Sequence, residues 1–479
     1  MNRIDRRAFL MEACSASLLS GCASGRFWGV EPRLRLGVIG DIHITTPEST
    51  VDFVRALEYF RDRQADAVIV VGDLSDFGLR SGFKFVADAW YSVFPDDRAP
   101  DGRKVEKLFC TGNHDYDGYA YGDMTLDMHA RGYSEDDALV RHGMAKCWEE
   151  AFHEPWAPIC HRRVKGYDFV GADWKGFREI GAWMRENASR IDHSKPFFYF
   201  QHPPLGGTTI NTVGECDGGV GKAALAGFPN AVAFSGHYHL TLNDERSVWQ
   251  DGFTSITVPS MSYTTIPEGY ENGGGRRNGA SALSMRCIPS RFEETEAQGY
   301  FVSVYDRRMV VERRDFEVGC EAAAPWVLPL PAETGGAFSP AVRRAIVPVP
   351  QFPPNAELKL NFRNCVTRND RWQIALVCDV PAASSANGGR VFDYELRAEP
   401  LDGTSPLVKR FLSPAFHKLP ADEPKMPRLY FNAAELPQDK AYRILVSPRN
   451  CFGVAGRPIR SEVLKGAPGL DKYSIGRSK

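Results

Sequence analysis

The chain has 479 residues, a formal net charge of −2, 43% hydrophobic residues and 25% charged residues. This length exceeds what one ordinary hydrophobic core serves, so two or three domains are expected. The near-neutral charge argues against a nucleic-acid-binding protein and against a basic protein of the membrane surface. No apolar run in the sequence reaches the roughly 20 residues that a transmembrane helix needs.

The first 30 residues are expected to lie outside the fold, as a signal and tether. They contain RRAFL, in which Arg6 and Arg7 are adjacent, and this pattern resembles a twin-arginine export signal. The run LLSGC, which ends at Cys22, resembles the lipobox of bacterial lipoproteins, whose lipidated cysteine tethers the protein to a membrane. A short amphipathic helix is the alternative explanation. We therefore expect a periplasmic or membrane-anchored protein and leave the lipidation of Cys22 open.

The cysteines do not indicate a disulfide framework or a zinc–thiolate site. The sequence holds eleven, and none forms a CxxC pair. One or two bridges fit an oxidising compartment, for example Cys147–Cys160 or Cys365–Cys378. Most of the others are expected to be small buried hydrophobic residues.

Strand patterns alternate with helix patterns between residues 31 and 320. Strands are expected within 34–40, 66–76, 105–115, 167–173, 195–204, 222–239, 252–260 and 300–318. Helices are expected at 48–63, 81–94 and 176–190, and a short one precedes the strand within 222–239. This alternation predicts a layered α/β domain over residues 31–320.

The composition changes near residue 320. Residues 321–354 are rich in Pro and Ala and are interpreted as a linker. Beyond it, short strand patterns separated by turns predict a smaller β-sandwich domain over residues 355–479. The run from 442 to 453 resembles the strand pair near the end of fibronectin type III domains, and another type of sandwich stays open.

Residues of metal-binding types follow five of the expected strands. Ligand sites of open α/β sheets lie beyond the carboxyl ends of the strands, so these side chains are expected to converge. Each one alone has a structural explanation, such as a helix cap for Asp76 or a turn for Asn113. Five such coincidences in order favour a single site instead. The candidates are Asp41, His43, Asp73, Asn113, His114, His202, His237 and His239.

The pair in GHYH illustrates the expected geometry. If the chain stays extended past Gly236, His237 and His239 point the same way, with their residues roughly 6–7 Å apart. Two imidazoles would then enter one site from the same side of a strand end.

The ordered set of motifs resembles that of the calcineurin-like metallophosphoesterase superfamily. The matching elements are DxH, GDxxD, GNHD, a single histidine and GHxH, spread over residues 33–318. The resemblance implies a four-layer αββα sandwich that hydrolyses phosphoric esters at a dinuclear metal centre. The C-terminal third of the chain lies outside it.

The resemblance also implies a role for each ligand. One metal ion would be held by Asp41, His43 and His239, the other by Asn113, His202 and His237, and Asp73 would bridge the two. A carboxylate can bridge two cations, which an imidazole cannot. The mixed nitrogen and oxygen ligands suit two divalent Mn, Fe, Zn or Co ions. A hydroxide shared by the ions would attack the phosphorus in line.

His114 belongs to GNHD but is left without a metal in this scheme. The resemblance places it beside the leaving group, as a general acid or as a stabiliser of the transition state. We expect Asp115 to orient its ring. The purple acid phosphatases of the superfamily carry a tyrosine ligand where this chain has Asp76, so no Fe(III)–phenolate centre is expected.

The substrate is not fixed by the sequence. Residues 116–166 form an insertion that is either a cap over the site or a surface excursion that packs on the sandwich domain. In the glycine-rich loop 269–280, Arg276 and Arg277 either meet a phosphate or lie in a solvated loop. The form of the motifs most resembles phosphodiesterases of the cyclic-nucleotide and glycerophosphodiester type, which leaves monoesters open.

A phosphate-ester small molecule is therefore the expected partner, with neither specific nucleic-acid binding nor an obligate protein partner. The alternative function is a non-enzymatic surface protein that binds a glycan or a protein through its β-sandwich. Because every ligand position is filled, the enzyme is favoured.

Overall fold

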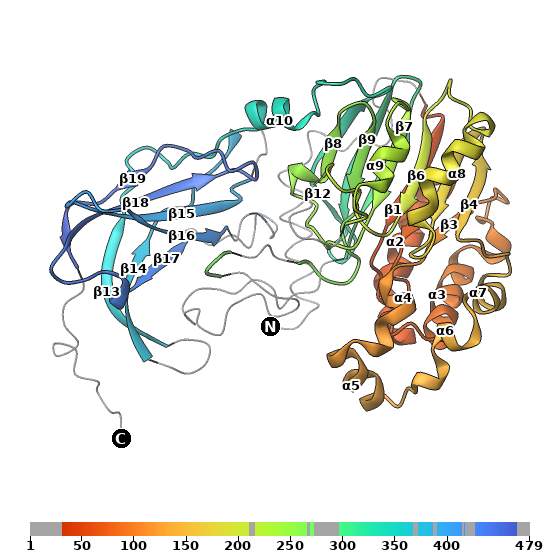
Figure 1. Cartoon of the computed structure of the whole chain (residues 1–479), viewed down its shortest axis with the longest axis horizontal. Coiled ribbons are helices and arrows are strands. Elements are labelled where there is room, and N and C mark those ends of the chain that lie inside the picture. The colour runs from red at the N-terminus through yellow and green to blue at the C-terminus, as the bar shows by residue number, and fades with distance from the viewer. Residues whose placement is uncertain are drawn as a thin grey trace. The chain divides into compact units, whose positions relative to one another are not determined.

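The computed structural model describes residues 31–209, 216–265, 269–272, 297–366, 372–386, 390–413, 416 and 427–466. The chain divides into two compact units (Figure 1). The first comprises residues up to 264 and residues 295–343, and the second comprises 265–294 and the chain from 344 onward. Within the described residues, no helix is long and apolar enough to cross a membrane.

The first unit contains two six-stranded mixed sheets. One has the order β12-β11-β10-β1-β2-β3, with β1 at Leu34–Ile39, β2 at Ala67–Val71, β3 at Glu106–Cys110, β10 at Gln298–Val304, β11 at Arg308–Asp315 and β12 at Cys320–Pro329. The other has the order β4-β5-β6-β7-β9-β8, with β4 at Ile159–Val164, β5 at Tyr167–Ala172, β6 at Phe197–Gln201, β7 at Ala231–Ser235, β8 at Val248–Gln250 and β9 at Thr254–Thr257. The strands that precede the five motifs run parallel to one another within each sheet.

The alternation of side chains along β2 shows why the sheets pack face to face. Ile69 and Val71 point into a core shared with Phe198 of the other sheet. Val68 and Val70 point the opposite way, into a core lined by helices. Strands buried on both faces read as continuous apolar runs, which is why AVIVV was recognisable in the sequence.

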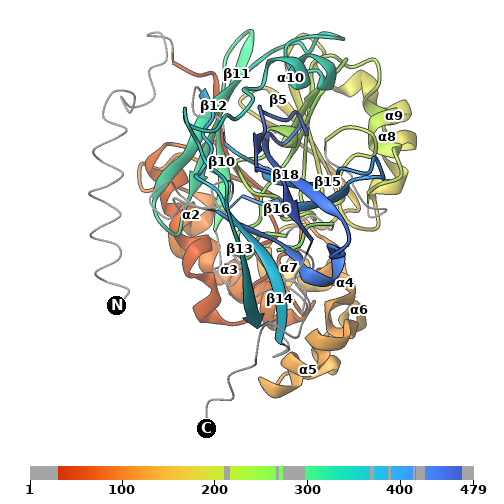
Figure 2. The same cartoon turned by 90° about the vertical axis from the view of Figure 1, so that its left-hand side faces the viewer.

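Helices cover both outer faces of the paired sheets. On one side lie α2 at Val51–Asp62, α3 at Arg80–Val93 and α7 at Met144–Phe152, and on the other α8 at Ile180–Asn187 and α9 at Val220–Leu225. Figure 2 shows α2 and the pair α8 and α9 on opposite sides of the strands. The expected four-layer αββα sandwich is confirmed.

The insertion after GNHD packs on the first unit itself. It begins within α4 at Asn113–Asp117, contains α5 at Gly122–Ala130, α6 at Leu139–His142 and α7, and ends with β4. Trp148 and Phe152 of α7 contact Phe83 of α3, so this half of the insertion belongs to the domain core. The insertion is therefore not a simple surface excursion.

The predicted linker 321–354 is wrong in its first part. Cys320–Pro329 forms β12, which pairs with β11 at the edge of the sheet, and Pro340–Ile346 forms α10. An edge strand tolerates Pro325 because one side of its backbone lacks a ladder partner. The Pro- and Ala-rich composition hid this strand.

The second unit is all-β, as predicted. One sheet has the order β13-β14-β17, at Lys359–Val366, Trp372–Asp379 and Arg428–Asn432. The other has the order β16-β15-β18-β19, at Leu407–Leu412, Asp393–Pro400, Ala441–Arg449 and Ile459–Arg460, and β20 at Leu464–Lys465 also pairs with β18. Leu376 and Phe431 of the first sheet share a core with Leu396 and Val446 of the second. The fibronectin-like topology stays a prediction.

Part of the glycine-rich loop 269–280 belongs to this second unit. The Asn272 side chain accepts from Leu412 N at 2.8 Å and donates to Leu412 O at 3.0 Å. The domain boundaries predicted from sequence missed this excursion. Arg276 and Arg277, the predicted phosphate contacts, lie outside the described residues.

The two suggested disulfides are absent, because all eight cysteines within the described residues are free. Cys365 lies opposite Gln373 in the β13–β14 pair, and Cys378 lies opposite Leu360, so these two thiols are several rungs apart. Cys147 and Cys378 are buried among hydrophobic side chains, as expected for small core residues.

Candidate metal centre

Backbone hydrogen bonds join the loops that follow the parallel strands. Asp41 N donates to Gly72 O at 3.0 Å, and His43 N donates to Asp73 O at 2.9 Å. Within the other sheet, Gly236 N donates to His202 O at 2.9 Å, and across the two sheets His237 N donates to Asp41 Oδ1 at 3.0 Å. These bonds hold the five motifs at one end of the sandwich, as the positions of the strand ends predict.

The backbone at most of the candidate ligands is strained. Five of them have a left-handed conformation, with φ of 51° at Asp41, 46° at His43, 51° at Asp73, 73° at His237 and 49° at His239. Non-glycine residues in such conformations cost about 1–3 kcal/mol each and persist where the surroundings enforce them. Such a cluster of outliers indicates a functional constraint on the direction of these side chains.

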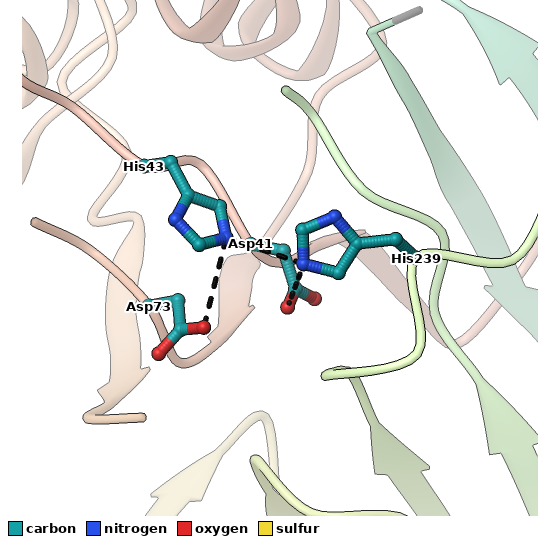
Figure 3. A group of neighbouring side chains, drawn as sticks. All are labelled: Asp41, His43, Asp73 and His239. Atoms are coloured by element: carbon teal, nitrogen blue, oxygen red, sulfur yellow. Dashed lines mark hydrogen bonds and ion pairs between the residues drawn. The ribbon is translucent and has the colours of Figure 1, made fainter. Parts of the chain in front are cut away.

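The first group of ligands comprises Asp41, His43, Asp73 and His239, all buried, with ligand atoms within 4.8 Å of one another (Figure 3). His239 Nε2 lies 3.1 Å from Asp41 Oδ1 and 3.2 Å from His43 Nε2. His43 Nε2 lies 3.6 Å from Asp73 Oδ2. Two imidazoles and two carboxylates thus aim at one point.

The second group comprises Asp73, His202 and His237, with Asn113 beside them. His202 Nε2 lies 3.1 Å from Asp73 Oδ2, 3.1 Å from His237 Nδ1 and 3.0 Å from Asn113 Oδ1. Asp73 Oδ2 therefore faces both groups. Its other oxygen, Oδ1, accepts from His114 N at 2.9 Å, which fixes the carboxylate in this orientation.

The remaining nitrogens of three histidines show which lone pairs face the centre. His202 Nδ1 donates to Val71 O at 2.7 Å, and His239 Nδ1 donates to Tyr263 O at 3.0 Å, since a carbonyl only accepts. His43 Nδ1 likewise donates to Asp76 Oδ1 at 2.8 Å. The neutral rings then turn their Nε2 lone pairs inward, as in metal-bound histidines.

The donor set fits a pair of divalent cations. With Nδ1 protonated, the Nε2 lone pairs of His43 and His239 face each other at 3.2 Å, and a cation between them removes the repulsion. Without a cation, a proton takes its place: burial lowers the pKa of His202, but the carboxylates of Asp73 and Asp41 outweigh this and raise the pKa to about 9. The facing Nε2 atoms and the raised pKa of His202 have the same cause: the buried site holds more lone-pair-bearing nitrogen and oxygen atoms than donors.

His114 lies beside the first group. Its Nδ1 donates to Asp76 O at 2.9 Å and is 3.1 Å from Asp76 Oδ1. Its ring meets that of His43 edge-on, with centroids 4.6 Å apart. Burial lowers the pKa of His114, but the charges of Asp73 and Asp76 outweigh this and raise the pKa to about 9.

The prediction that Asp115 orients His114 is wrong. Asp115 Oδ2 accepts from Gly112 N at 2.8 Å and Leu74 N at 3.2 Å, and Oδ1 accepts from Ser75 N at 2.8 Å. Asp115 therefore joins the loops of GDxxD and GNHD, and Asp76 orients the ring of His114. The last position of GDxxD was visible in the sequence, but its two histidine partners depend on the tertiary structure.

The expected extended chain at GHYH is also wrong. β7 ends at Ser235, and both histidines adopt left-handed conformations. His237 consequently faces His202, while His239 faces Asp41 and His43. The two imidazoles serve the two different groups instead of entering the site side by side.

Gly72 is expected to be irreplaceable. Its φ is 92°, and a Cβ at this position would lie 2.5 Å from His202 Nδ1, so Gly72→Ala must displace a ligand. Metal content and activity should fall together. Gly102→Ala is the matched control, because Gly102 has φ of 82° with no atom within 4 Å of its Cβ. Elemental analysis and thermal melting of both variants check this, and full metal content in Gly72→Ala would contradict it.

Residues 34–244 match the family model of the calcineurin-like phosphoesterases. This part of the first unit is therefore similar to a calcineurin-like phosphoesterase domain. The motif resemblance seen in the sequence is thereby confirmed, and the match supports a hydrolase of phosphoric esters. A search of curated proteins finds no match to this chain.

Solved structures similar to this chain share little sequence with it. A dimetal phosphatase from Danio rerio is 11% identical, covering 62% of this chain and 99% of its own, with a TM-score of 0.35. A purple acid phosphatase from yellow lupin (Lupinus luteus) seeds is 13% identical, covering 62% and 53%, with a TM-score of 0.35. The anchor in the inner membrane complex of Plasmodium is 11% identical, covering 62% and 88%, with a TM-score of 0.35.

Proposed function

We propose that this chain uses a dinuclear centre to hydrolyse phosphodiesters or phosphomonoesters, with His114 assisting the leaving group. The observation that carries the proposal is the position of Asp73 Oδ2, which lies 3.6 Å from His43 Nε2 and 3.1 Å from His202 Nε2. One carboxylate oxygen thus belongs to both ligand groups, as a bridging ligand requires.

The residues that would hold each ion follow from the two groups. One ion fits among Asp41, His43, Asp73 and His239, and the other among Asp73, Asn113, His202 and His237. When bound, two divalent cations supply a positive field for the phosphoryl oxygens and lower the pKa of a shared water. The buried ligands hold this site rigid through their strained loops and outer hydrogen bonds.

We assign His114 to the ester rather than to either ion, because its Nδ1 bonds Asp76 and it belongs to neither of the two groups that share Asp73. Asp76 holds its Nδ1, so only Nε2 remains to meet the substrate. A protonated His114 can donate that proton to the departing oxygen or stabilise its charge. Asp76 also holds His43, and its carboxylate therefore couples the orientation of a ligand to that of His114.

The metal-loaded protein is expected to hold about two transition-metal ions per chain, because the donor set forms two groups with one shared carboxylate. Elemental analysis after loading with Mn, Fe, Zn or Co measures this. The same preparations should hydrolyse members of a panel of phosphomonoesters and phosphodiesters. No bound metal after loading would end the dinuclear proposal.

We further propose that the protein is exported. The support is the sequence of residues 1–30, with its twin arginines and the lipobox-like run at Cys22. Replacing Arg6 and Arg7 by lysine should retain the protein in the cytoplasm of a bacterial host, and cell fractionation with immunoblotting checks this. Unchanged export of the double variant would contradict the twin-arginine route. Substitution of Cys22 separately tests lipidation through labelling with a radioactive fatty acid.

A further inference from the structure

Three aromatic side chains from outside the five motifs surround the candidate centre: Tyr121, Trp174 and Tyr263. Tyr121 comes from the insertion, Trp174 from the loop after β5, and Tyr263 from the loop after β9. Each is half-buried, so each keeps surface that a ligand can contact.

Tyr121 stands beside the GNHD residues. Its hydroxyl accepts from Asn113 Nδ2 at 3.1 Å, which leaves Asn113 Oδ1 to face His202. The ring meets that of His114 edge-on, with centroids 5.0 Å apart and planes at 76°. An organic group next to His114 therefore finds an aromatic surface there.

Trp174 stands beside the second ligand group. Its ring centroid lies 5.9 Å from those of both His202 and His237. The loop is held in place, since Trp174 N donates to Thr111 Oγ1 at 3.3 Å and the buried Asp173 accepts from Gly176 N at 2.5 Å.

Tyr263 stands beside the first ligand group. Its ring centroid lies 4.1 Å from that of His239 and 5.5 Å from that of His43. Ser260 fixes this loop, because its Oγ accepts from Tyr263 N at 3.2 Å and donates to Asp41 O at 3.1 Å. All three rings are thus attached to the motif loops themselves.

We propose that Tyr121, Trp174 and Tyr263 form an aromatic wall that binds the organic part of the ester. This wall selects esters that carry a planar ring, such as an aryl or a nucleoside group, over esters of small alcohols. Aromatic faces stack on planar rings and gain little from a methyl group. This inference rests on the proposed phosphoesterase function and names its substrate class.

Three p-nitrophenyl phosphodiesters test the wall, with methyl, phenyl and thymidine 5′ as the second group. They share one leaving group, so the chemical step is matched, and the group that stays on the phosphorus is the variable. The phenyl and thymidine esters should exceed the methyl ester in kcat/KM by about tenfold. Tyr121→Ala and Trp174→Ala should lower this ratio, mainly through KM, whereas Tyr121→Phe, which keeps the ring, should preserve it.

A binding measurement gives a readout independent of turnover. Calorimetry should show phenylphosphonate binding to the metal-loaded wild type more tightly than methylphosphonate, with the difference reduced in both alanine variants. Tyr91→Ala is the control, since Tyr91 is a half-buried tyrosine whose hydroxyl bonds Phe152 O away from the centre. Its ratios should match those of the wild type.

The outcomes separate the two proposals. If the metal-loaded wild type hydrolyses none of the esters, the proposed function fails, and the phosphonate ratio decides the wall by itself. If the wild type is active but treats the three esters alike and binds the two phosphonates equally well, the wall is wrong. An equal relative loss of kcat/KM on all three esters in the alanine variants, or a loss of metal, would show that the rings only support the histidines. Either result would also overturn the wall.

Discussion

Asp73→Asn is expected to lose metal and activity together, by more than about 100-fold in metal affinity or in kcat/KM. The reason is the position of Oδ2, which faces His43 on one side and His202 on the other. The amide keeps the shape and can keep the bond from His114 N to Oδ1, so the variant removes the bridging charge with little other change. Elemental analysis and a phosphodiesterase assay on the same preparation measure both losses.

Asp168→Asn is the matched control for this variant. Asp168 is equally buried and accepts from His161 and Arg163, but it lies on β5 away from the ligand groups. It should keep the full metal content whatever its effect on stability. Full activity of Asp73→Asn at normal metal content would show that Asp73 is not the bridge.

The layers and the gathering of the candidate ligands at one place were predictable because they depend on local patterns. The motif-bearing strands, such as β2, are buried on both faces, so their apolar runs stand out from the polar residues that follow them. Parallel strands then bring their carboxyl ends together whatever the details of the packing. The site residues could be assembled from order alone.

The failures concern interactions that sequence spacing does not encode. The left-handed backbone at His237 and His239 overrides the period-two rule for side-chain direction. Asp76 and Asp115 are both acids after a strand, and only the fold shows that one meets imidazoles and the other backbone amides. Trp174 sits far from every motif in the chain and carries no local signal of its place beside His202.

His114→Ala separates chemistry from assembly. The ring of His114 contacts Asp76 and the ring of His43. His114 is not a member of either of the two ligand groups that share Asp73. The variant should therefore keep both metals and the fold, while kcat falls by about 10²- to 10⁴-fold, the usual range for a positioned general acid. His161→Ala is the control. It removes a histidine of β4 that bonds Asp168 of β5, and it should leave kcat unchanged.

The size of the loss should depend on the leaving group. An alkoxide leaves poorly and needs a proton, so alkyl esters should lose the most activity in His114→Ala. A nitrophenolate leaves without one, so nitrophenyl esters should lose less. Measuring kcat on both ester types beside the metal content resolves the role of the ring. Equal losses on both esters would assign His114 to stabilising charge in the transition state. Loss of one metal ion would instead show that His114 is a ligand. The hydrogen bond from its Nδ1 to Asp76 would then orient Nε2 toward that ion.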